Sequence, residues 1–292
     1  EGVCRFDGKS FTYFTVKDGL SDNQIRSIHE DRNGVVWFEG GFGISGFDGE
    51  RIITPTHRNY GSKDDWRLGT GDLWFKEDGG AGATAAEAQP GVYRYDGKTF
   101  TYLAYPVPAD PARLFDYATT DIAKGKGGRL WFATYSTVFG YDGKSFTKID
   151  DKSLGLNDST GSLHVRCVLE DSKGRLWIGN NGIGVILHDG HTDTRFTQEK
   201  GLGKLGPHGG RTIPQPGDVT DGSPTLHRVF SIGEDSAGNI WFGTVEHGAW
   251  RYDGKSLKNY TAKDGLTSKD IMGIYTDRHG DLWLAGSGVF KF

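Results

Sequence analysis

The sequence lacks the features that mark membrane-spanning, nucleic-acid-binding and disulfide-rich proteins. No apolar run approaches the roughly 20 residues that cross a bilayer, so membrane insertion is excluded. The net charge of −4 argues against nucleic acid as a partner, because phosphate binding requires a basic surface. Only two cysteines occur, Cys4 and Cys167, and we expect no disulfide because they fall in different kinds of strand of different repeats.

Motifs of several common enzyme classes are also missing. The sequence contains no Gly-x-Ser-x-Gly elbow, no His-Glu-x-x-His and no phosphate-binding glycine loop, so nothing in it indicates those hydrolase, metalloprotease or nucleotide-binding sites. The chain starts at Glu1, without an initiator methionine or a signal peptide, which predicts a processed or trimmed chain.

Glycine and aromatic residues, by contrast, are abundant, as is typical of an all-β protein. Residues 169–190 show how they are used. A tight turn is expected at residues 171–174, and strands are expected at residues 175–178 and 184–188. Asp189-Gly190 is predicted to be a two-residue hairpin connection, in which the glycine meets the demand for a positive φ.

This unit recurs along the chain. Its tryptophan is found again at intervals of 37 to 64 residues, close to the period of four-stranded propeller blades. The equivalent tryptophans are Trp37, Trp74, Trp131, Trp177, Trp241 and Trp283, and the Asp-Gly pairs begin at Asp7, Asp48, Asp96, Asp142, Asp189 and Asp253. The sequence therefore predicts an all-β fold, a six-bladed β-propeller of four-stranded antiparallel blades, with residues 1–292 in a single domain.

Two parts of this propeller are irregular in sequence. Residues 9–15 are predicted to supply the fourth strand of the last blade and so to close the propeller. Residues 2–6 and 288–292 duplicate each other as third strands, and the sequence leaves open which of them fills that place in the closing blade. The first strand of the second blade is expected within residues 59–68, although the usual apolar pattern is absent there.

The repeat motifs resemble the two-component regulator propeller repeat family. The resemblance is carried by Gly19-Leu20, by the strand 25–28, by Asp31-Arg-Asn-Gly34 with Trp37, and by Trp241-Phe-Gly-Thr244 with its following Gly248-Ala-Trp-Arg-Tyr-Asp-Gly254. It extends over nearly the whole chain and implies the propeller fold. It also implies a periplasmic or extracellular location, because such propellers are sensor portions of larger regulators or stand-alone secreted proteins. Since no helical membrane or kinase segment is found, the stand-alone form is expected here.

When the blades are aligned on their tryptophans, residues at the same distance from the tryptophan form a column of equivalent positions. A residue whose type differs from the rest of its column is a candidate site residue. Ten positions before the tryptophan most residues are small, and Cys167 is expected to be a packing residue there. Asp121 is an unusual polar member of this column and is predicted to bind a ligand. Two positions after the tryptophan, Glu39 and Lys76 replace Gly or Ala, and these charges are expected to face the channel end or each other.

The starts of the first strands are rich in basic residues. Arginine and histidine at a channel mouth favour an anionic ligand such as a carboxylate, a phosphate or an acidic sugar. The long loops 50–66, 76–90, 103–116 and 198–226 are predicted to surround the same face. The alternative is a collar of salt bridges with acidic neighbours such as Asp116 and Asp270. The basic residues are Arg26, His164, Arg166, His227 and Arg228, with His247 as a further ligand-binding candidate.

Three functional classes remain open from the sequence. The first is a periplasmic or secreted monomer that binds a small polar or anionic molecule or a saccharide at the channel mouth. The second is a lyase or hydrolase at the same face, with His164 or His227 as general base and with Arg or metal assistance. The third is a protein-interaction platform. No cofactor is identified, and no residue is assigned as a metal ligand, but a divalent metal is the alternative if His164, His208, His227 and His247 meet.

Overall fold

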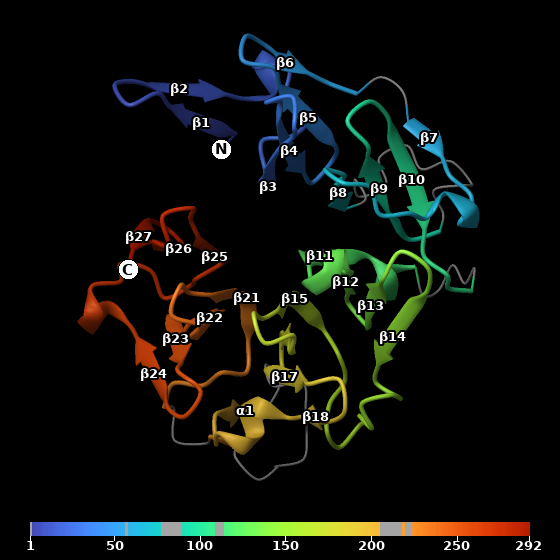
Figure 1. The fold of residues 1–292 in the computed structure, drawn as a ribbon. Helices are drawn as coiled ribbons and strands as arrows, with labels where there is room; N and C mark the ends of the chain where they lie inside the picture. Colours follow the sequence, from blue (N-terminus) through green and yellow to red (C-terminus); the bar gives the residue numbers. More distant parts are fainter. Residues whose placement is uncertain (1, 56–57, 77–88, 109–113, 205–217, 220–222) are drawn as a thin grey trace. The chain divides into compact units, whose positions relative to one another are not determined.

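The structure is a computed structural model, and it describes residues 2–55, 58–76, 89–108, 114–204, 218–219 and 223–292. The chain divides into two compact units, Glu1–Thr119 and Thr120–Phe292. Almost all of the regular structure is β-strand, in sheets of up to four strands, and a single four-residue α-helix is described. The secondary-structure elements are labelled in Figure 1.

The first unit contains two four-stranded sheets and an N-terminal hairpin. The hairpin pairs β1 (Val3–Phe6) with β2 (Phe11–Phe14). Blade one consists of β3 (Ile25–Glu30), β4 (Val36–Gly40), β5 (Ile44–Phe47) and β6 (Ile52–Ile53) in chain order. Blade two consists of β7 (Arg58–Tyr60), β8 (Leu73–Lys76), β9 (Gly91–Tyr95) and β10 (Phe100–Ala104). Short 3-10 helices lie at η1 (Val16–Asp18), η2 (Lys63–Asp65) and η4 (Phe115–Tyr117).

The second unit contains the other four blades. Blade three has β11 (Thr119–Lys124), β12 (Leu130–Thr134), β13 (Thr137–Tyr141) and β14 (Phe146–Asp150), and blade four has β15 (Val165–Glu170), β16 (Leu176–Asn180), β17 (Val185–His188) and β18 (Asp193–Thr194). Blade five has β21 (Val229–Glu234), β22 (Ile240–Thr244), β23 (Ala249–Tyr252) and β24 (Leu257–Tyr260), and blade six has β25 (Gly273–Thr276), β26 (Leu282–Ala285) and β27 (Val289–Lys291). The remaining elements are η5 (Lys126–Gly128), α1 (Phe196–Glu199), β19 (Gly203–Lys204), β20 (Asp218–Val219) and η6 (Ala262–Asp264).

The six predicted tryptophans occupy equivalent places. Each is the second residue of the strand that follows the Asp-x-x-Gly turn or its counterpart, namely β4, β8, β12, β16, β22 or β26. This confirms the prediction of six blades in an all-β propeller fold. In blade four the indole Nε1 of Trp177 donates to Asp171 Oδ2 at 2.8 Å, six residues earlier, and the same hydrogen bond recurs in blades one, five and six. The turn aspartate therefore links the tight turn to the tryptophan of its blade.

Blade three keeps a hydrogen bond to its tryptophan although the turn aspartate is missing. Gly125 stands six residues before Trp131, where blades one, four, five and six have aspartate. The indole of Trp131 donates instead to Glu170 Oε2 of blade four, at 2.5 Å. A Cβ atom at residue 125 would overlap that carboxylate, so the glycine leaves room for a substitute acceptor from the next blade.

The six Asp-Gly turns share one geometry. The aspartate Oδ1 accepts the backbone N–H groups two and three residues later, as in Asp189 with His191 and Thr192. The glycine has positive φ, 90° at Gly190. Sequence reasoning placed the aspartate and the glycine in the two-residue connection, and this was wrong by one residue. Asp189 N–H bonds the Thr192 carbonyl, so Gly190 and His191 are the central residues and Asp189 precedes them.

These turns give a direct stability prediction. We expect Gly190→Val to lower the free energy of unfolding by about 1–3 kcal/mol, because a β-branched residue is strained at positive φ. No atom lies within 4 Å of a Cβ built at residue 190, so backbone strain is the main cause. Thermal unfolding followed by circular dichroism measures the change. His191→Val, at the other central position, is the control, and an unchanged melting temperature of Gly190→Val would contradict the turn assignment.

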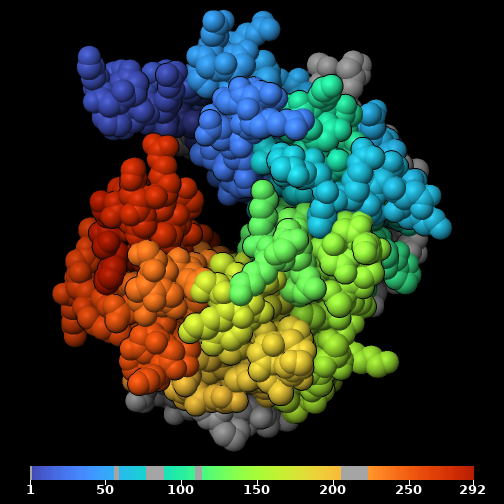
Figure 2. Space-filling view, in the orientation of Figure 1, coloured from blue at the N-terminus to red at the C-terminus, as the bar shows by residue number. Residues whose placement is uncertain are grey.

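Successive blades within each unit pack face to face. In unit 2 the ring of Trp177 in blade four meets Phe242 of blade five, with centroids 5.5 Å apart, and both side chains are completely buried. In unit 1, Trp37 of blade one packs in the same way against Phe100 of blade two, at 5.0 Å. Figure 2 shows the blades of unit 2 touching in the order of the sequence colours, from green to red. The tryptophan faces therefore form the core between neighbouring sheets.

Blade two differs from the sequence prediction. Residues 58–60 do form a strand, but β7 runs parallel to β10 at the edge of the sheet and does not pair with β8. The predicted antiparallel first strand is therefore wrong for this blade. The physical reason is the missing apolar pattern, since Asn59 and Tyr60 are exposed. Trp66 supplies apolar cover to this blade in another way, by stacking on Trp74 with ring centroids 5.7 Å apart.

The strand pairing near the C-terminus shows which of the two duplicate segments forms the third strand of blade six. Residues 289–291, as β27, pair with β26 and supply the third strand of blade six. Residues 3–6, as β1, pair with β2. Blade six has three strands among the described residues. Its closure by residues 9–15, and with it the arrangement of residues 1–292 as one domain, stays a prediction.

Candidate functional site

The starts of the first strands in unit 2 share a backbone geometry that sets the candidate site. In blades four, five and six the start is hydrogen-bonded to the loop between strands two and three of the preceding blade, as in Val165 N–H to the Tyr135 carbonyl at 3.0 Å. In blades four and five the strand then has a register shift, between Val165 and Cys167 and between Val229 and Ser231. Such a bulge leaves the extra residue outside the regular pairing and redirects its side chain. The extra residues are Arg166 and Phe230.

Arg166 lies between two aromatic rings. Its guanidinium carbon is 5.0 Å from the centroid of Tyr135 and 4.9 Å from that of Phe230. Nη1 donates to the Tyr135 hydroxyl at 3.3 Å, and the buried Nε has no hydrogen-bond partner among the described residues. Ring faces stabilise a cation but do not accept its N–H groups in the way that a carboxylate does. Arg166 is thus a half-buried cation without an acidic partner in the described part of the chain.

Arg228 lies on the same aromatic side chain. Its guanidinium carbon is 6.0 Å from the centroid of Phe230, so this ring contacts both arginines. Arg228 Nε donates to Asn181 Oδ1 at 3.0 Å, and its Nη1 lies 3.4 Å from Glu246 Oε1. The structure therefore brings together the two predicted arginines of blades four and five. One is paired with a carboxylate, and the other is enclosed by rings.

Two histidines near these arginines have lowered pKa values. Burial, together with the positive charge of Arg166, lowers the pKa of His164, whose ring packs against Tyr135 at 4.9 Å between centroids. Burial is also the main cause that lowers the pKa of His247; Arg228 adds to it, whereas Glu246 opposes it. The Nε2 atoms of both histidines are buried without a hydrogen-bond partner among the described residues. Burial and the nearby positive charges therefore favour the neutral form of both imidazoles.

His227 is placed differently from the other candidate histidines. Its side chain is 0 % exposed, and its Nδ1 is hydrogen-bonded to Thr225 Oγ1. Its ring lies 6.0 Å from that of His247, between centroids. Its backbone carbonyl accepts the N–H groups of Gly182 and Gly184, which ties blade five to blade four. A ligand in solvent reaches His164 or His247 more readily than His227.

Asp121 lies at the contact between blades three and four, and Cys167 lies at the contact between blades four and five. Asp121 Oδ2 accepts the Val168 N–H at 3.0 Å, so its carboxylate satisfies the backbone of the neighbouring blade. Cys167 is a free, buried thiol in the core between blades four and five, as the small-residue column predicts. Burial raises the pKa of this thiol well above its ordinary value, and the charge of Asp121 adds to the shift.

The remaining predicted residues lie in unit 1. Glu39 is 3 % exposed, accepts the Ser27 hydroxyl at 2.8 Å and lies 3.5 Å from Lys76 Nζ. Of the two alternatives, the structure shows these charges facing each other. Arg26 is exposed, and its guanidinium lies beside Gly41 in the loop between β4 and β5. It stays a prediction that one ligand site includes Arg26, Glu39 and Lys76.

Metal binding was the alternative for the histidines. Among residues 2–55, 58–76, 89–108, 114–204, 218–219 and 223–292, no group of three His, Cys, Asp or Glu side chains is arranged to hold a metal ion. His208, one of the four histidines considered, lies outside the described residues, as do most of the long loops 76–90 and 198–226.

Sequence reasoning missed several contact residues of this cluster. Phe230 stands in the same tryptophan-aligned column as Arg166 and Arg26, and that column was the signal that could have revealed it. Tyr135 and Asn181 lie in loops between strands two and three, where spacing alone does not indicate which side chain turns toward a neighbouring blade. Glu246, in the equivalent loop of blade five, was missed for the same reason.

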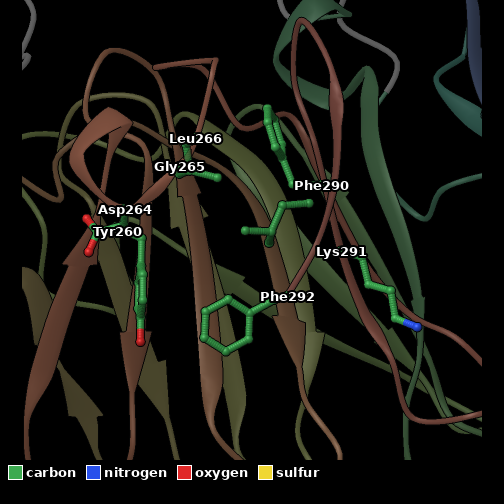
Figure 3. Close-up of a pocket in the computed structure, with 8 residues that line it drawn as sticks. Tyr260, Asp264, Gly265, Leu266, Phe290, Lys291 and Phe292 are labelled. Carbon is green, nitrogen blue, oxygen red and sulfur yellow. The ribbon is translucent and has the colours of Figure 1, made fainter.

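A separate groove lies beside the last two strands of unit 2. It has a volume of about 380 Å³ and is lined mainly by apolar side chains, among them Leu266, Leu284 and Phe290. Figure 3 shows Tyr260 and Phe292 along it, with the amino group of Lys291 pointing away. None of the predicted site residues lines this groove, and its apolar wall does not suit an anionic ligand.

Three segments of the chain, residues 19–38, 160–182 and 223–246, match the sequence profile described as two component regulator propeller. These segments are two component regulator propeller repeats. The resemblance predicted from the motifs is confirmed. The matched repeats contain all five basic residues singled out at the first strands, from Arg26 to Arg228. None of the curated proteins compared with the chain matches it.

Solved structures share the fold of these repeats. The first is described as the extracellular domain of a hybrid two component system from B. thetaiotaomicron, with a TM-score of 0.63 and 19% identity over 99% of this chain. This chain covers 35% of that domain, about a third of its length. A streptogramin B lyase has a TM-score of 0.58 and 16% identity, with 94% of this chain and 84% of the lyase covered. A catalytically inactive variant of virginiamycin B lyase from Staphylococcus aureus, with quinupristin, has a TM-score of 0.57 and 15% identity, with 97% and 83% covered.

No described helix has the length and apolar character needed to cross a membrane.

Proposed function

We propose that this protein is an extracellular or periplasmic propeller that binds a small polar or anionic ligand at the first-strand starts of unit 2. The ligand carries a carboxylate, a phosphate or an acidic sugar group. The single observation that supports this most strongly is Arg166. A guanidinium remains charged at all relevant pH values, and removing it from water requires compensation. Tyr135 and Phe230 provide part of this compensation, and an anionic ligand would provide the rest.

The rest of the cluster suits the same ligand class. Arg228 adds a second guanidinium next to Phe230, and Asn181 holds its Nε in place. A planar guanidinium can bind carboxylate or phosphate through two parallel hydrogen bonds. The rings of Tyr135 and Phe230 offer apolar surface beside the charged groups, which is the usual composition of a small-molecule site.

Calorimetry at low salt tests this proposal. The probes are inorganic phosphate, acetate and glucuronate, each titrated into the whole chain. We expect Arg166→Ala to weaken the binding of the best probe by about 1.5–3 kcal/mol, the value of a hydrogen bond to a charged group. Arg195→Ala is the control, because Arg195 donates to the Thr160 carbonyl at 3.1 Å outside this cluster. Equal affinities of wild type and Arg166→Ala would place the ligand elsewhere.

A second candidate function is a lyase or hydrolase at the same place, and the state of His164 favours it. A neutral imidazole beside a cation is suited to act as a general base while the cation stabilises developing negative charge. At this level of identity the lyases share the fold with this chain, and a shared fold does not indicate a shared reaction.

His164→Gln separates the two functions. It keeps a hydrogen-bonding side chain but removes the base. An enzyme that uses His164 should lose about 10²–10⁴-fold in kcat and still bind its substrate, whereas a binding protein should show only a modest change in affinity. A derivative of the best-binding probe that has a cleavable bond is used as substrate (a phosphate monoester for phosphate, an acetate ester for acetate, a glucuronide for glucuronate), and its consumption is followed by NMR. His227→Gln is the companion variant, which we expect to affect stability more than turnover because His227 is completely buried.

A further inference from the structure

The backbone of Glu246 is unusual. Among the described residues it is the single non-glycine with positive φ, 78°. The equivalent residue of blade four is Gly182, with φ of 135°. The two loops correspond because Thr244 N–H bonds the Gly248 carbonyl at 3.0 Å, just as Asn180 N–H bonds the Gly184 carbonyl at 2.9 Å. Glycine therefore suits this position, and in blade five a glutamate takes its place at a conformational cost.

Stability does not account for this glutamate. Its N–H donates to Asp270 Oδ1 at 2.8 Å, but a glycine N–H can make the same bond. Its side chain is 53 % exposed, and its Oε1 lies 3.4 Å from Arg228 Nη1. An exposed ion pair of this length contributes less to stability than a positive φ costs. Strained non-glycine residues occur mainly at functional sites, where a side chain is needed in one place.

The strained backbone of Glu246 places its carboxylate beside Arg228. This arginine is 20 % exposed and is oriented by Asn181, and it shares the Phe230 ring with Arg166. Of the two arginines, only Arg228 has a carboxylate partner among the described residues. The side chain that pairs with it is the exposed one, which can rotate into solvent while the arginine stays.

We propose that Glu246 is a specificity-determining residue, a displaceable internal carboxylate that occupies Arg228 until an anionic ligand takes its place. This inference rests on the proposed function of the cluster. Glu246 supplies the charge that Arg228 needs in the absence of ligand. It also competes with the ligand, so that only an anion able to engage both arginines binds well. The positive φ directs the Glu246 side chain toward Arg228, and rotation of that side chain releases the arginine.

Binding of inorganic phosphate tests the competition. In low-salt calorimetry of the whole chain, we expect Glu246→Gln to bind phosphate about threefold to fivefold more tightly than wild type, because the exposed pair no longer has to be broken. In the double variant of Glu246→Gln with Arg228→Ala, the gain should disappear. Equal or weaker binding by Glu246→Gln overturns the proposal, and so does the absence of phosphate binding in both wild type and Glu246→Gln.

Thermal unfolding tests the strain independently of any ligand. Glu246→Gly should raise the melting temperature by about 1–5 °C, since it removes the strained conformation, whereas Glu246→Gln keeps the strain and should not. A melting temperature of Glu246→Gly at or below that of wild type overturns the argument from the backbone. Arg166→Ala in the same phosphate titration separates the two proposals. If Arg166→Ala loses binding while Glu246→Gln is unchanged, the ligand site stands and the role of Glu246 fails.

Discussion

Asp171→Ala is expected to lower the free energy of unfolding by about 3–5 kcal/mol, because it removes one partner of a buried, charged network. The side chain of Asp171 is 1 % exposed. Its Oδ2 accepts Trp177 Nε1 at 2.8 Å and lies 2.7 Å from Arg175 Nη2, and its Oδ1 accepts the backbone N–H groups of Lys173 and Arg175. Burial acts to raise the pKa of this carboxyl, but the hydrogen bonds from Trp177 and Arg175 lower it below its ordinary value.

The loss arises at both ends of the network. In the alanine variant the indole N–H of Trp177 is left without an acceptor in a completely buried place, and the 171–174 turn loses its side-chain bonds. Chemical denaturation with urea, followed by tryptophan fluorescence, measures the change. Asp277→Ala is the matched control, because Asp277 bonds Trp283 in the same way at 2.9 Å but is partly exposed. An effect of Asp171→Ala no larger than that of Asp277→Ala would show that burial does not set the size of the loss.

Gly184→Ala should be the most damaging substitution of a glycine by alanine in blade four, at about 2–6 kcal/mol, because two separate costs act at one atom. The φ of Gly184 is 77°, which is unfavourable for any residue with a Cβ. In addition, a Cβ at residue 184 would overlap the Leu226 carbonyl oxygen and Thr197 Oγ1. The backbone cannot withdraw easily, because the Gly184 N–H donates to the His227 carbonyl and its own carbonyl accepts from Asn180.

Gly190→Ala separates the two costs. Its φ is 90°, but no atom lies within 4 Å of its built Cβ, so it carries the strain without the overlap. We expect Gly190→Ala to cost about 1–2 kcal/mol. Thermal or urea unfolding compares the two variants under the same conditions. If Gly184→Ala is no worse than Gly190→Ala, the close approach of Leu226 and Thr197 is not energetically important.

Part of the candidate site could be predicted from the sequence. The columns placed Arg166, Arg228 and His164 near the first-strand starts, because residues at the same distance from the blade tryptophan occupy equivalent places in a repeat. The contacts could not be predicted. Whether Arg166 meets an acid or a ring depends on the Phe230 side chain of the next blade and on the bulge that turns both residues. The tryptophan-aligned column predicts where a residue lies in its own blade, but not which side chain of the next blade it contacts.

The sequence by itself determined the six tryptophan strands and the turns with positive φ at glycine. These features depend on local chemistry, since Asp-x-x-Gly and Asp-Gly turns need only a few neighbouring residues. Only the tertiary structure decided that β7 pairs with β10, that residues 289–291 form the third strand of blade six, and that Glu246 adopts positive φ beside Arg228. The physical reason is that pairing and strain depend on competing partners far away in the chain. Their relative free energies are set by packing between sheets and are not encoded in any one repeat.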